Sequence, residues 1–272
     1  MSARTLVLVC TYNEVENLPE LFEQLGHYLP RADILVVDDS SPDGTAAWVR
    51  AHPRYRTHTA ASVDSAIYLI QRSGKHGLGT ATREGLRWCL DRAYDYIINL
   101  DADLSHPPEY APVLLAACQA APATGSTAEP RATSGGTVSS DIAASGTLAC
   151  DVAIGSRYVT GGSSPGLPGH RRWISRLLNV YANNLLRLPV KDCSGSYRCY
   201  RVDALRRIDL SQLNCPGYGF LEELLVALHR SGARIAEYPI EFRARSGGHS
   251  KLGLSDAWGA MRVIHKLAFS RR

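Results

Sequence analysis

The segment Tyr96-Ile97-Ile98-Asn99-Leu100-Asp101-Ala102-Asp103-Leu104-Ser105-His106 places two carboxylates directly after an apolar run. A short apolar run bounded by polar residues and proline is typical of a buried strand. Residues two apart on an extended backbone point the same way, so we expect Asp101 and Asp103 to converge just beyond the strand. Ligands bind at the carboxyl ends of strands in open α/β sheets. Because paired carboxylates repel unless a cation neutralises them, the segment predicts a divalent cation with phosphate attached.

The same residues also fit a solvated turn, because an Asp side chain readily starts a turn by bonding to nearby backbone. This segment alone does not separate the turn from the metal site. The choice between the two depends on the rest of the chain.

The composition of the 272 residues is that of a soluble globular protein, with 45% hydrophobic and 21% charged residues. The net charge of +4 indicates an anionic ligand or surface rather than nucleic acid, for which a dense basic stripe would be expected. The seven cysteines are scattered and form no Cys-x-x-Cys motif, so neither a zinc site nor a disulfide framework is predicted. Reduced thiols in the cytosol are the simplest interpretation.

The sequence contains no recognisable targeting or membrane-spanning segment. Residues 1–4 lead directly into a strand-like run, without the apolar region of a secretory signal. No stretch is long and apolar enough to cross a bilayer. We therefore expect a cytoplasmic protein that meets a membrane peripherally, at its cytoplasmic face, or through a separate membrane-anchoring protein.

Strand-like and helix-like segments alternate through the first part of the chain. Four apolar runs predict buried strands: 5–10, 34–37, 66–70 and 96–100. The alternation predicts an α/β fold with a mixed, mostly parallel central sheet, in one domain over residues 1–253. Acidic residues follow three of these runs: Glu14, Asp38 with Asp39, and Asp101 with Asp103.

A glycine loop, residues 74–80, precedes a predicted helix. It lacks the Gly-Lys-Ser/Thr ending of a Walker A motif, and no G-x-G-x-x-G follows the first predicted strand, which disfavours a dinucleotide-dependent dehydrogenase. The glycines and the free N–H groups of a helix start would suit an anion. A tight strand-to-helix turn explains the same residues equally well, so both alternatives stay open.

Two segments differ from the rest of the predicted domain. Within residues 119–150, the run 120–146 is rich in Ala, Ser, Thr and Gly and has few large apolar residues, so we expect a flexible surface insertion. Residues 254–272 predict an amphipathic C-terminal helix or tail without a transmembrane segment. Its pattern fits a helix on an anionic membrane and a helix packed on the core equally well.

A basic segment, His170 to Arg176, follows a Gly/Ser/Pro loop and opens a predicted helix. Arg171 and Ser175 lie one turn apart on one face of that helix. Guanidinium groups match phosphate oxygens, so we favour an anion clamp over a solvated basic helix face. A second basic loop, residues 243–253, is also rich in glycine.

The order and spacing of these motifs resemble the dolichol-phosphate (polyprenol-phosphate) mannosyltransferases, inverting enzymes of glycosyltransferase family 2 with a GT-A fold. The resemblance covers nearly the whole chain except 120–146. The matching blocks are 11–14, 37–45, 77–81, 101–106, 155–158, 171–179, 194–198, 217–218, 239–240 with 242, and 250–253. Each block alone is weakly specific, but their joint order is specific.

The resemblance implies transfer of mannose from GDP-mannose to a polyprenyl (dolichyl) phosphate in a membrane. It implies a donor site made of Cys10, Tyr12, Glu14, Val37, Asp39, Asp101, Ala102, Asp103, Arg245 and Lys251. Mg²⁺ or Mn²⁺ would lie at Asp103 and Ser105. The acceptor phosphate would be held by Arg157, Arg171 and Ser175.

The implied reaction has a lipid phosphate oxygen as its nucleophile, which is anionic near neutral pH, so no strong general base is required. The metal, with Arg245 and Lys251, would offset the charge on the departing diphosphate. Asp103, Arg157 and Arg171 are the predicted catalytic residues. Arg171→Ala should therefore raise the acceptor requirement far more than the donor requirement.

Three departures from the family pattern leave the identity of the sugar and of the lipid substrate open. Leu167 stands where the family often has Trp, Leu221 where it often has Gln, and Cys10 where it often has Pro. The main alternative is a sibling enzyme that passes glucose or another sugar from a UDP-sugar or a GDP-sugar to undecaprenyl phosphate. A non-catalytic nucleotide-sugar binder is disfavoured, because the chain keeps both aspartates of the first motif and the basic residues of the 243–253 loop.

Overall fold

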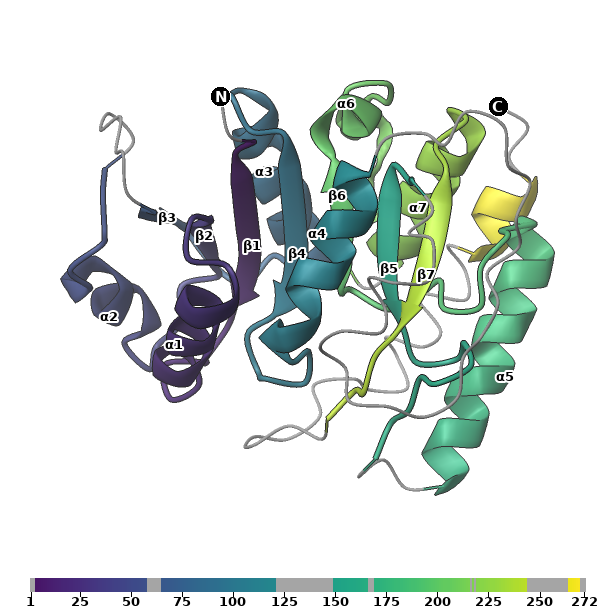
Figure 1. The fold of residues 1–272 in the computed structure, drawn as a ribbon, viewed down its shortest axis with the longest axis horizontal. Helices are drawn as coiled ribbons and strands as arrows, with labels where there is room; N and C mark the ends of the chain where they lie inside the picture. The colour runs from purple at the N-terminus through teal and green to yellow at the C-terminus, as the bar shows by residue number, and fades with distance from the viewer. Residues whose placement is uncertain are drawn as a thin grey trace.

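The computed structural model describes residues 3–57, 65–120, 149–165, 169–215, 217, 219–243 and 264–269, without the side chains of His170 and Arg171. Seven strands of this part form one sheet in the order β3-β2-β1-β4-β6-β5-β7. They are β1 (Thr5–Thr11), β2 (Asp33–Asp38), β3 (Ile67–Gln71), β4 (Tyr96–Asp101), β5 (Val152–Ser156), β6 (Arg198–Arg201) and β7 (Ile235–Pro239). β6 runs antiparallel to both neighbours and the other pairs are parallel, which confirms the predicted α/β fold (Figure 1).

The central strands are apolar on both faces because helices cover both faces of the sheet. In β1, Val7 and Val9 contribute to the core on one face of the sheet, whereas Leu6 and Leu8 contribute to the core on the other. This period of two follows from the alternation of side chains along an extended backbone. The four predicted apolar runs correspond in this way to β1, β2, β3 and β4.

Two helical layers cover the sheet, and Figure 1 shows α1 and α4 in front of it and α3 and α7 behind it. The first layer contains α1 (Leu18–Tyr28), α2 (Thr45–Ala51) and α4 (Ala111–Gln119). The second contains α3 (Leu78–Leu90), α5 (Gly169–Leu186), α6 (Val202–Leu205) and α7 (Phe220–Arg230). Two 3-10 turns, η1 (Pro108–Tyr110) and η2 (Leu210–Gln212), complete the elements of the described residues.

The predicted insertion lies almost entirely outside the described residues. The chain on either side of it is joined by a hydrogen bond from the N–H of Cys150 to the carbonyl of Ala117 (3.2 Å). In the predicted C-terminal segment, 264–269 are described, and Ile264 is buried in the core beneath the second helical layer. This agrees with the core-packing alternative for that residue. In the part of the chain covered by the structure, no helix combines the length and the apolar character needed to cross a bilayer.

Candidate active site

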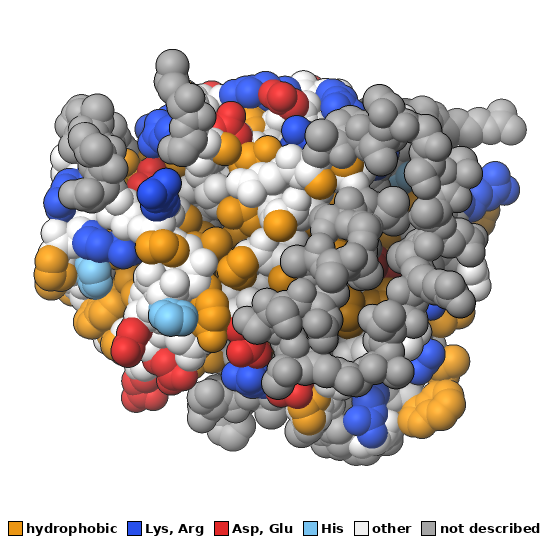
Figure 2. All heavy atoms as spheres, in the orientation of Figure 1, with side chains coloured by type: hydrophobic (Ala, Val, Ile, Leu, Met, Phe, Trp, Pro, Cys, Tyr) orange, Lys and Arg blue, Asp and Glu red, His pale blue; other side chains and the backbone are white. Residues whose placement is uncertain are grey.

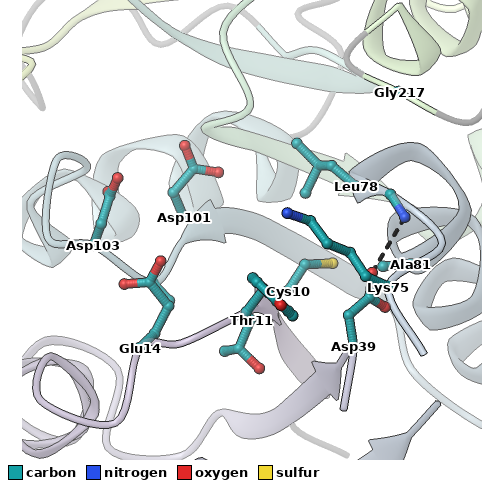
Figure 3. Close-up of a pocket in the computed structure, with 13 residues that line it drawn as sticks. Cys10, Thr11, Glu14, Asp39, Lys75, Leu78, Ala81, Asp101, Asp103 and Gly217 are labelled. Carbon is teal, nitrogen blue, oxygen red and sulfur yellow. Dashed lines mark hydrogen bonds between the residues drawn. The ribbon is translucent and has the colours of Figure 1, made fainter. Parts of the chain in front are cut away.

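A pocket opens where β1, β2 and β4 end, at one edge of the sheet (Figure 3). Ligands bind at the carboxyl ends of the strands in open α/β folds. The pocket has a volume of about 280 Å³, just below the usual range for small-molecule sites. Its lining consists of Cys10, Thr11, Tyr12, Glu14, Asp39, Lys75, Gly77, Leu78, Ala81, Asp101, Ala102, Asp103 and Gly217.

Asp101 and Asp103 lie on the same side of the pocket with their carboxylates pointing in the same direction, as predicted, and Glu14 lies on that side too (Figure 3). Asp101 Oδ1 accepts a hydrogen bond from Ser196 Oγ (2.8 Å). Asp103 Oδ1 accepts hydrogen bonds from the N–H (3.1 Å) and the hydroxyl (2.5 Å) of Ser105. The protein therefore fixes the direction of both aspartate side chains.

His106 stabilises the turn that follows β4. Its side chain is buried, and its Nδ1 accepts a hydrogen bond from the backbone N–H of Asp101 (3.1 Å). An accepting Nδ1 carries no proton, so the ring is neutral with its proton on Nε2. Burial lowers the pKa of His106, which favours the neutral ring although an Asp101 carboxylate oxygen lies 3.6 Å from Nδ1.

Three residues other than glycine adopt positive φ in the loops that border the pocket. Asn13 (59°) follows β1, Ser40 (54°) follows β2 and Leu104 (61°) follows β4. A left-handed backbone is costly for a residue with a Cβ, above all for leucine. Such strain persists only where the surrounding structure enforces it, and it is concentrated at functional sites.

Asp39 connects the glycine loop to the end of β2. Its Oδ2 accepts the N–H groups of His76 (3.1 Å) and Gly77 (3.2 Å), and its Oδ1 accepts a hydrogen bond from Arg72 Nη1. The N–H groups of His76 and Gly77, directly before α3, are therefore bound by a carboxylate of the protein. Asp39 thus holds the turn that leads into α3.

Lys75 lines the pocket, although it is not one of the predicted site residues. Its ammonium lies 4.3 Å from the centroid of the Tyr12 ring, and Figure 3 shows it extending into the pocket across from Asp101. A cation over an aromatic ring is attracted by the negative face of that ring. A lysine inside a glycine loop was the available signal in the sequence.

The remaining predicted donor residues occupy different positions. Cys10 and Ala102 line the pocket, and burial raises the pKa of the Cys10 thiol to about 12, so this thiol stays protonated. Val37 pairs with Cys10 in the sheet. Its side chain is buried in the core, and it is not one of the described residues that line the pocket. Arg245 and Lys251 lie outside the described residues.

The predicted acceptor residues come from the end of β5 and from α5. Arg157 follows β5 directly, and Asp192 accepts hydrogen bonds from its Nε and Nη2, both at 2.7 Å. Tyr158 follows Arg157 in the chain, and its hydroxyl lies 2.7 Å from Ser175 Oγ. Arg157 and Ser175 are thus linked through Tyr158, whereas the side chain of Arg171 is outside the described part.

Phe242 lies between Arg157, a predicted acceptor residue, and His106 in the turn that follows β4. Its ring centroid lies 5.4 Å from the guanidinium carbon of Arg157 and 5.3 Å from the centroid of the His106 ring. Because His106 binds the backbone of Asp101, these contacts join Arg157 to the end of β4. Asp192 was not predicted, since nothing in its local sequence links it to Arg157, 35 positions away.

The oxygen atoms of the pocket suit a hard divalent cation. Among the described residues, no group of three or more His, Cys, Asp or Glu side chains is arranged to enclose a metal by itself. Mg²⁺ at nucleotide sites is usually bound by one or two carboxylates together with substrate phosphates and water. The acidic pair Asp101 and Asp103 therefore fits a cation that the protein shares with a phosphate-bearing substrate.

Comparisons with known proteins identify the family of the chain. Residues 6–143 match the sequence profile described as Glycosyl transferase family 2. The chain is 37% identical over 249 residues to an undecaprenyl-phosphate mannosyltransferase of Micrococcus luteus, with 92% of this chain and 87% of that protein covered. It is 36% identical over 258 residues to a polyprenol monophosphomannose synthase of Mycolicibacterium smegmatis, with 95% and 84% covered.

Solved structures with the same fold include glucosyl-3-phosphoglycerate synthase from Mycobacterium tuberculosis in complex with Mn²⁺, UDP and phosphoglyceric acid. The TM-score is 0.61 at 15% identity, with 100% of this chain and 80% of that chain covered. At this identity the likeness concerns the fold alone. From the sequence profile and the two relatives, we conclude that this chain belongs to glycosyl transferase family 2.

Proposed function

We propose that the chain transfers mannose from GDP-mannose to a polyprenyl (dolichyl) phosphate, with inversion at the anomeric carbon. The observation that supports this most strongly is the acidic pair Asp101 and Asp103 at the end of β4, inside a pocket at the ligand-binding edge of the sheet. Two relatives of similar length carry names for mannosyl transfer to a polyprenyl carrier.

The donor would occupy the pocket. Tyr12 and Glu14, in the loop after β1, would contact the nucleoside, and the ammonium of Lys75 would face the diphosphate. Asp103, held by Ser105, would bind Mg²⁺ or Mn²⁺ together with the donor phosphates. A cation bound there would offset the negative charge that develops on the departing diphosphate.

The acceptor phosphate would be held by Arg157, Arg171 and Ser175. A phosphate monoester oxygen is already anionic near neutral pH, so it attacks without transferring a proton to the protein. The task of the protein is to hold two anionic groups in line, and guanidinium groups do this through paired N–H donors. The link through Tyr158 supports a common role for Arg157 and Ser175.

α5 offers a surface that could contact the membrane in which a lipid substrate lies. Six large hydrophobic side chains of this helix are exposed: Trp173, Ile174, Leu177, Leu178, Val180 and Tyr181. Figure 2 shows hydrophobic side chains protruding over α5 at the lower right. Arg172 and Arg176 are exposed on the same helix, which contains no acidic residue. Exposed apolar and basic residues on one helix are typical of peripheral binding to an anionic membrane, here at its cytoplasmic face.

A transfer assay with the purified protein tests the proposal. Radiolabelled GDP-mannose and UDP-glucose are incubated in turn, with and without polyprenyl phosphate and with and without EDTA. We expect label in the lipid fraction only when GDP-mannose, polyprenyl phosphate and a divalent cation are all present. Transfer from UDP-glucose instead would identify the sibling glycosyltransferase, and failure of both donors would contradict the proposal.

A pair of variants ties the activity to the acidic pair. Asp103→Asn should lower transfer by roughly a hundredfold or more, because it weakens the binding of the cation that would stabilise the negative charge on the departing diphosphate. Asp91→Asn changes an exposed carboxylate at the end of α3 and should leave the rate unchanged. Equal activity of the two variants would argue against a role for Asp103 in the reaction.

A further inference from the structure

Asp192 makes more contacts with Arg157 than a simple ion pair requires. Its side chain is fully buried, and its Oδ2 accepts hydrogen bonds from the backbone N–H (3.1 Å) and from Nε (2.7 Å) of Arg157. Its Oδ1 accepts from Nη2 of the same arginine (2.7 Å) and from the N–H of Gly195 (3.0 Å). A bidentate fork of this kind fixes the plane and the direction of a guanidinium group, not merely its charge.

The other contacts of Arg157 show that its orientation is constrained. Nη2 also donates to Ser194 Oγ (2.9 Å), and the rings of Tyr158 and Phe242 lie 5.0 Å and 5.4 Å from the guanidinium carbon. These hydrogen bonds involve Nε and Nη2, and among the described residues none accepts a hydrogen bond from Nη1. The edge of the guanidinium that carries Nη1 is therefore the one available to a phosphate oxygen.

The segment that contains Asp192 also reaches the acidic pair of the pocket. Ser196, four residues further on, donates its hydroxyl to Asp101 Oδ1 (2.8 Å). The fully buried Arg198 stabilises the segment by donating to the carbonyls of Cys193 (2.5 Å) and Gly195 (2.8 Å). One short stretch of chain thus restrains a carboxylate on the donor side and an arginine on the acceptor side.

We propose that Asp192 is a positioning residue that orients Arg157 toward the acceptor phosphate, and that the segment 192–196 sets the relative placement of acceptor and donor. This inference rests on the proposed function. Asp192 itself is buried behind the guanidinium and would not touch the substrate. Its negative charge also compensates a cation that would otherwise be buried without a partner when no acceptor is bound.

Steady-state kinetics of Asp192→Asn test this role. Asparagine keeps the size of the side chain and one acceptor oxygen but loses the charged fork, so Arg157 remains present in a less defined orientation. We expect the KM for polyprenyl phosphate to rise by roughly tenfold or more, while the KM for GDP-mannose stays within about twofold. A residue that only supported folding would lower the thermal midpoint without this split between the two substrates.

A second variant tests the same link if Asp192→Asn folds poorly. Arg157→Lys keeps the positive charge beside Asp192 but cannot form a bidentate fork. It should show the same split between the two KM values, and combining it with Asp192→Asn should add little to either single change, because both disrupt one interaction. If Asp192→Asn folds, additive losses in the double variant would overturn the proposal. If it does not fold, equal changes of both KM values in Arg157→Lys alone would overturn it.

Asp151 provides a matched control. It is also a buried aspartate beside β5, and it also binds an arginine, since it accepts hydrogen bonds from the backbone and the guanidinium of Arg234. It precedes β5, at the opposite end of that strand from Arg157. Asp151→Asn should lower the thermal midpoint and leave both KM values unchanged.

The outcomes separate this inference from the proposed function. If the wild type transfers mannose to polyprenyl phosphate but Asp192→Asn changes both KM values equally, or neither, only the positioning role is wrong. If the wild type uses no polyprenyl phosphate with any donor, the proposed function fails and this inference fails with it.

Discussion

Glu222, near the start of α7, is a buried carboxyl group whose Oε2 has no hydrogen-bond partner in the described part of the chain. Burial raises the pKa of Glu222 to about 7, because the charged form is poorly solvated there. The nearby charges have opposite effects, since Arg198 and Arg157 favour ionisation and Asp192 opposes it. The charge of Glu222 therefore interacts with Asp192, Arg157 and Arg198.

The raised pKa predicts how stability depends on pH. The unfolded chain releases this proton near the ordinary value of 4.5 and the folded chain releases it near 7, so the wild type should lose stability between these values as pH rises. Glu222→Gln removes this loss. The difference in unfolding free energy, variant minus wild type, should therefore increase by on the order of 3 kcal/mol from pH 4.5 to pH 7.

Denaturant unfolding at several pH values measures this difference. Glu20→Gln, at an exposed position of α1, serves as the control and should give a pH profile parallel to that of the wild type. If Glu222→Gln also runs parallel to the wild type, the carboxyl group does not titrate in this range.

At the scale of secondary-structure elements, α3 and the chain before α7 are packed with little space between them. A Cβ on Gly79 of α3 would lie 2.5 Å from the carbonyl oxygen of Cys215 and 2.6 Å from that of Gly217. Gly217 also lines the pocket, so this close approach shapes the wall of the site. Only glycine allows α3 to lie so near that backbone.

Gly79→Ala should therefore destabilise the protein, although alanine is the better helix former. Helix propensity would gain at most about 1 kcal/mol, whereas a backbone clash in a packed region typically costs about 1–3 kcal/mol, so we expect a net loss of roughly 1–2 kcal/mol. Gly169, at the start of α5, has open space where a Cβ would lie and is the matched control. Gly169→Ala should leave the thermal midpoint unchanged or slightly raised.

The elements show what could be predicted from the sequence. Apolar runs identified β1 to β4, because strands buried on both faces need hydrophobic residues at every position. β6 is only Arg198–Arg201, with an arginine at each end, and its antiparallel direction is decided by pairing across the sheet. The pattern predicted a mixed sheet, but no local feature indicates which strand runs in the opposite direction.

The candidate site was predictable to a similar degree. Asp101 and Asp103 directly follow an apolar run, so their place at the carboxyl end of a strand could be predicted, whereas the direction of Asp103 is set by the turn after β4 and by Ser105. The left-handed backbone of Leu104 has no signal in the sequence, because leucine rarely adopts it and only the surrounding structure enforces it. The partner of Arg157 was equally hidden, since a contact between Arg157 and Asp192 depends on the order of strands in the sheet.

At the scale of the whole molecule, α5 carries six of the seven exposed large hydrophobic side chains of the described residues. Trp173 is 69% and Leu177 is 62% exposed, and they lie one helical turn apart. Burying such side chains in a membrane interface would contribute about 1.5–3 kcal/mol each. The exposed arginines of the same helix would add attraction to anionic lipid.

Sedimentation with lipid vesicles tests this surface. The double variant Trp173→Ser with Leu177→Ser should bind vesicles containing anionic lipid at least roughly tenfold more weakly than the wild type. Replacing Arg172 and Arg176 by Glu should abolish the preference for anionic over neutral vesicles. Arg206→Glu changes an exposed arginine next to α6 and should have no effect.

Unchanged sedimentation of the α5 variants would mean that another part of the chain, or a separate anchoring protein, carries the contact with the membrane. Activity toward a short, water-soluble polyprenyl phosphate should survive the Trp173→Ser and Leu177→Ser changes, because neither residue lies in the pocket or binds Arg157.

The position of β6 has a geometric consequence for catalysis. Asp101 ends β4 and Arg157 follows β5, and the single strand β6 lies between β4 and β5. Neighbouring strands are about 4.8 Å apart, so the backbones that carry these two residues are separated by roughly 10 Å. Hydrogen bonds between strands maintain that separation, independently of the length of any surface loop. The sheet thus keeps this distance constant, and insertions elsewhere in the chain can vary without altering the spacing between the proposed donor and acceptor sites.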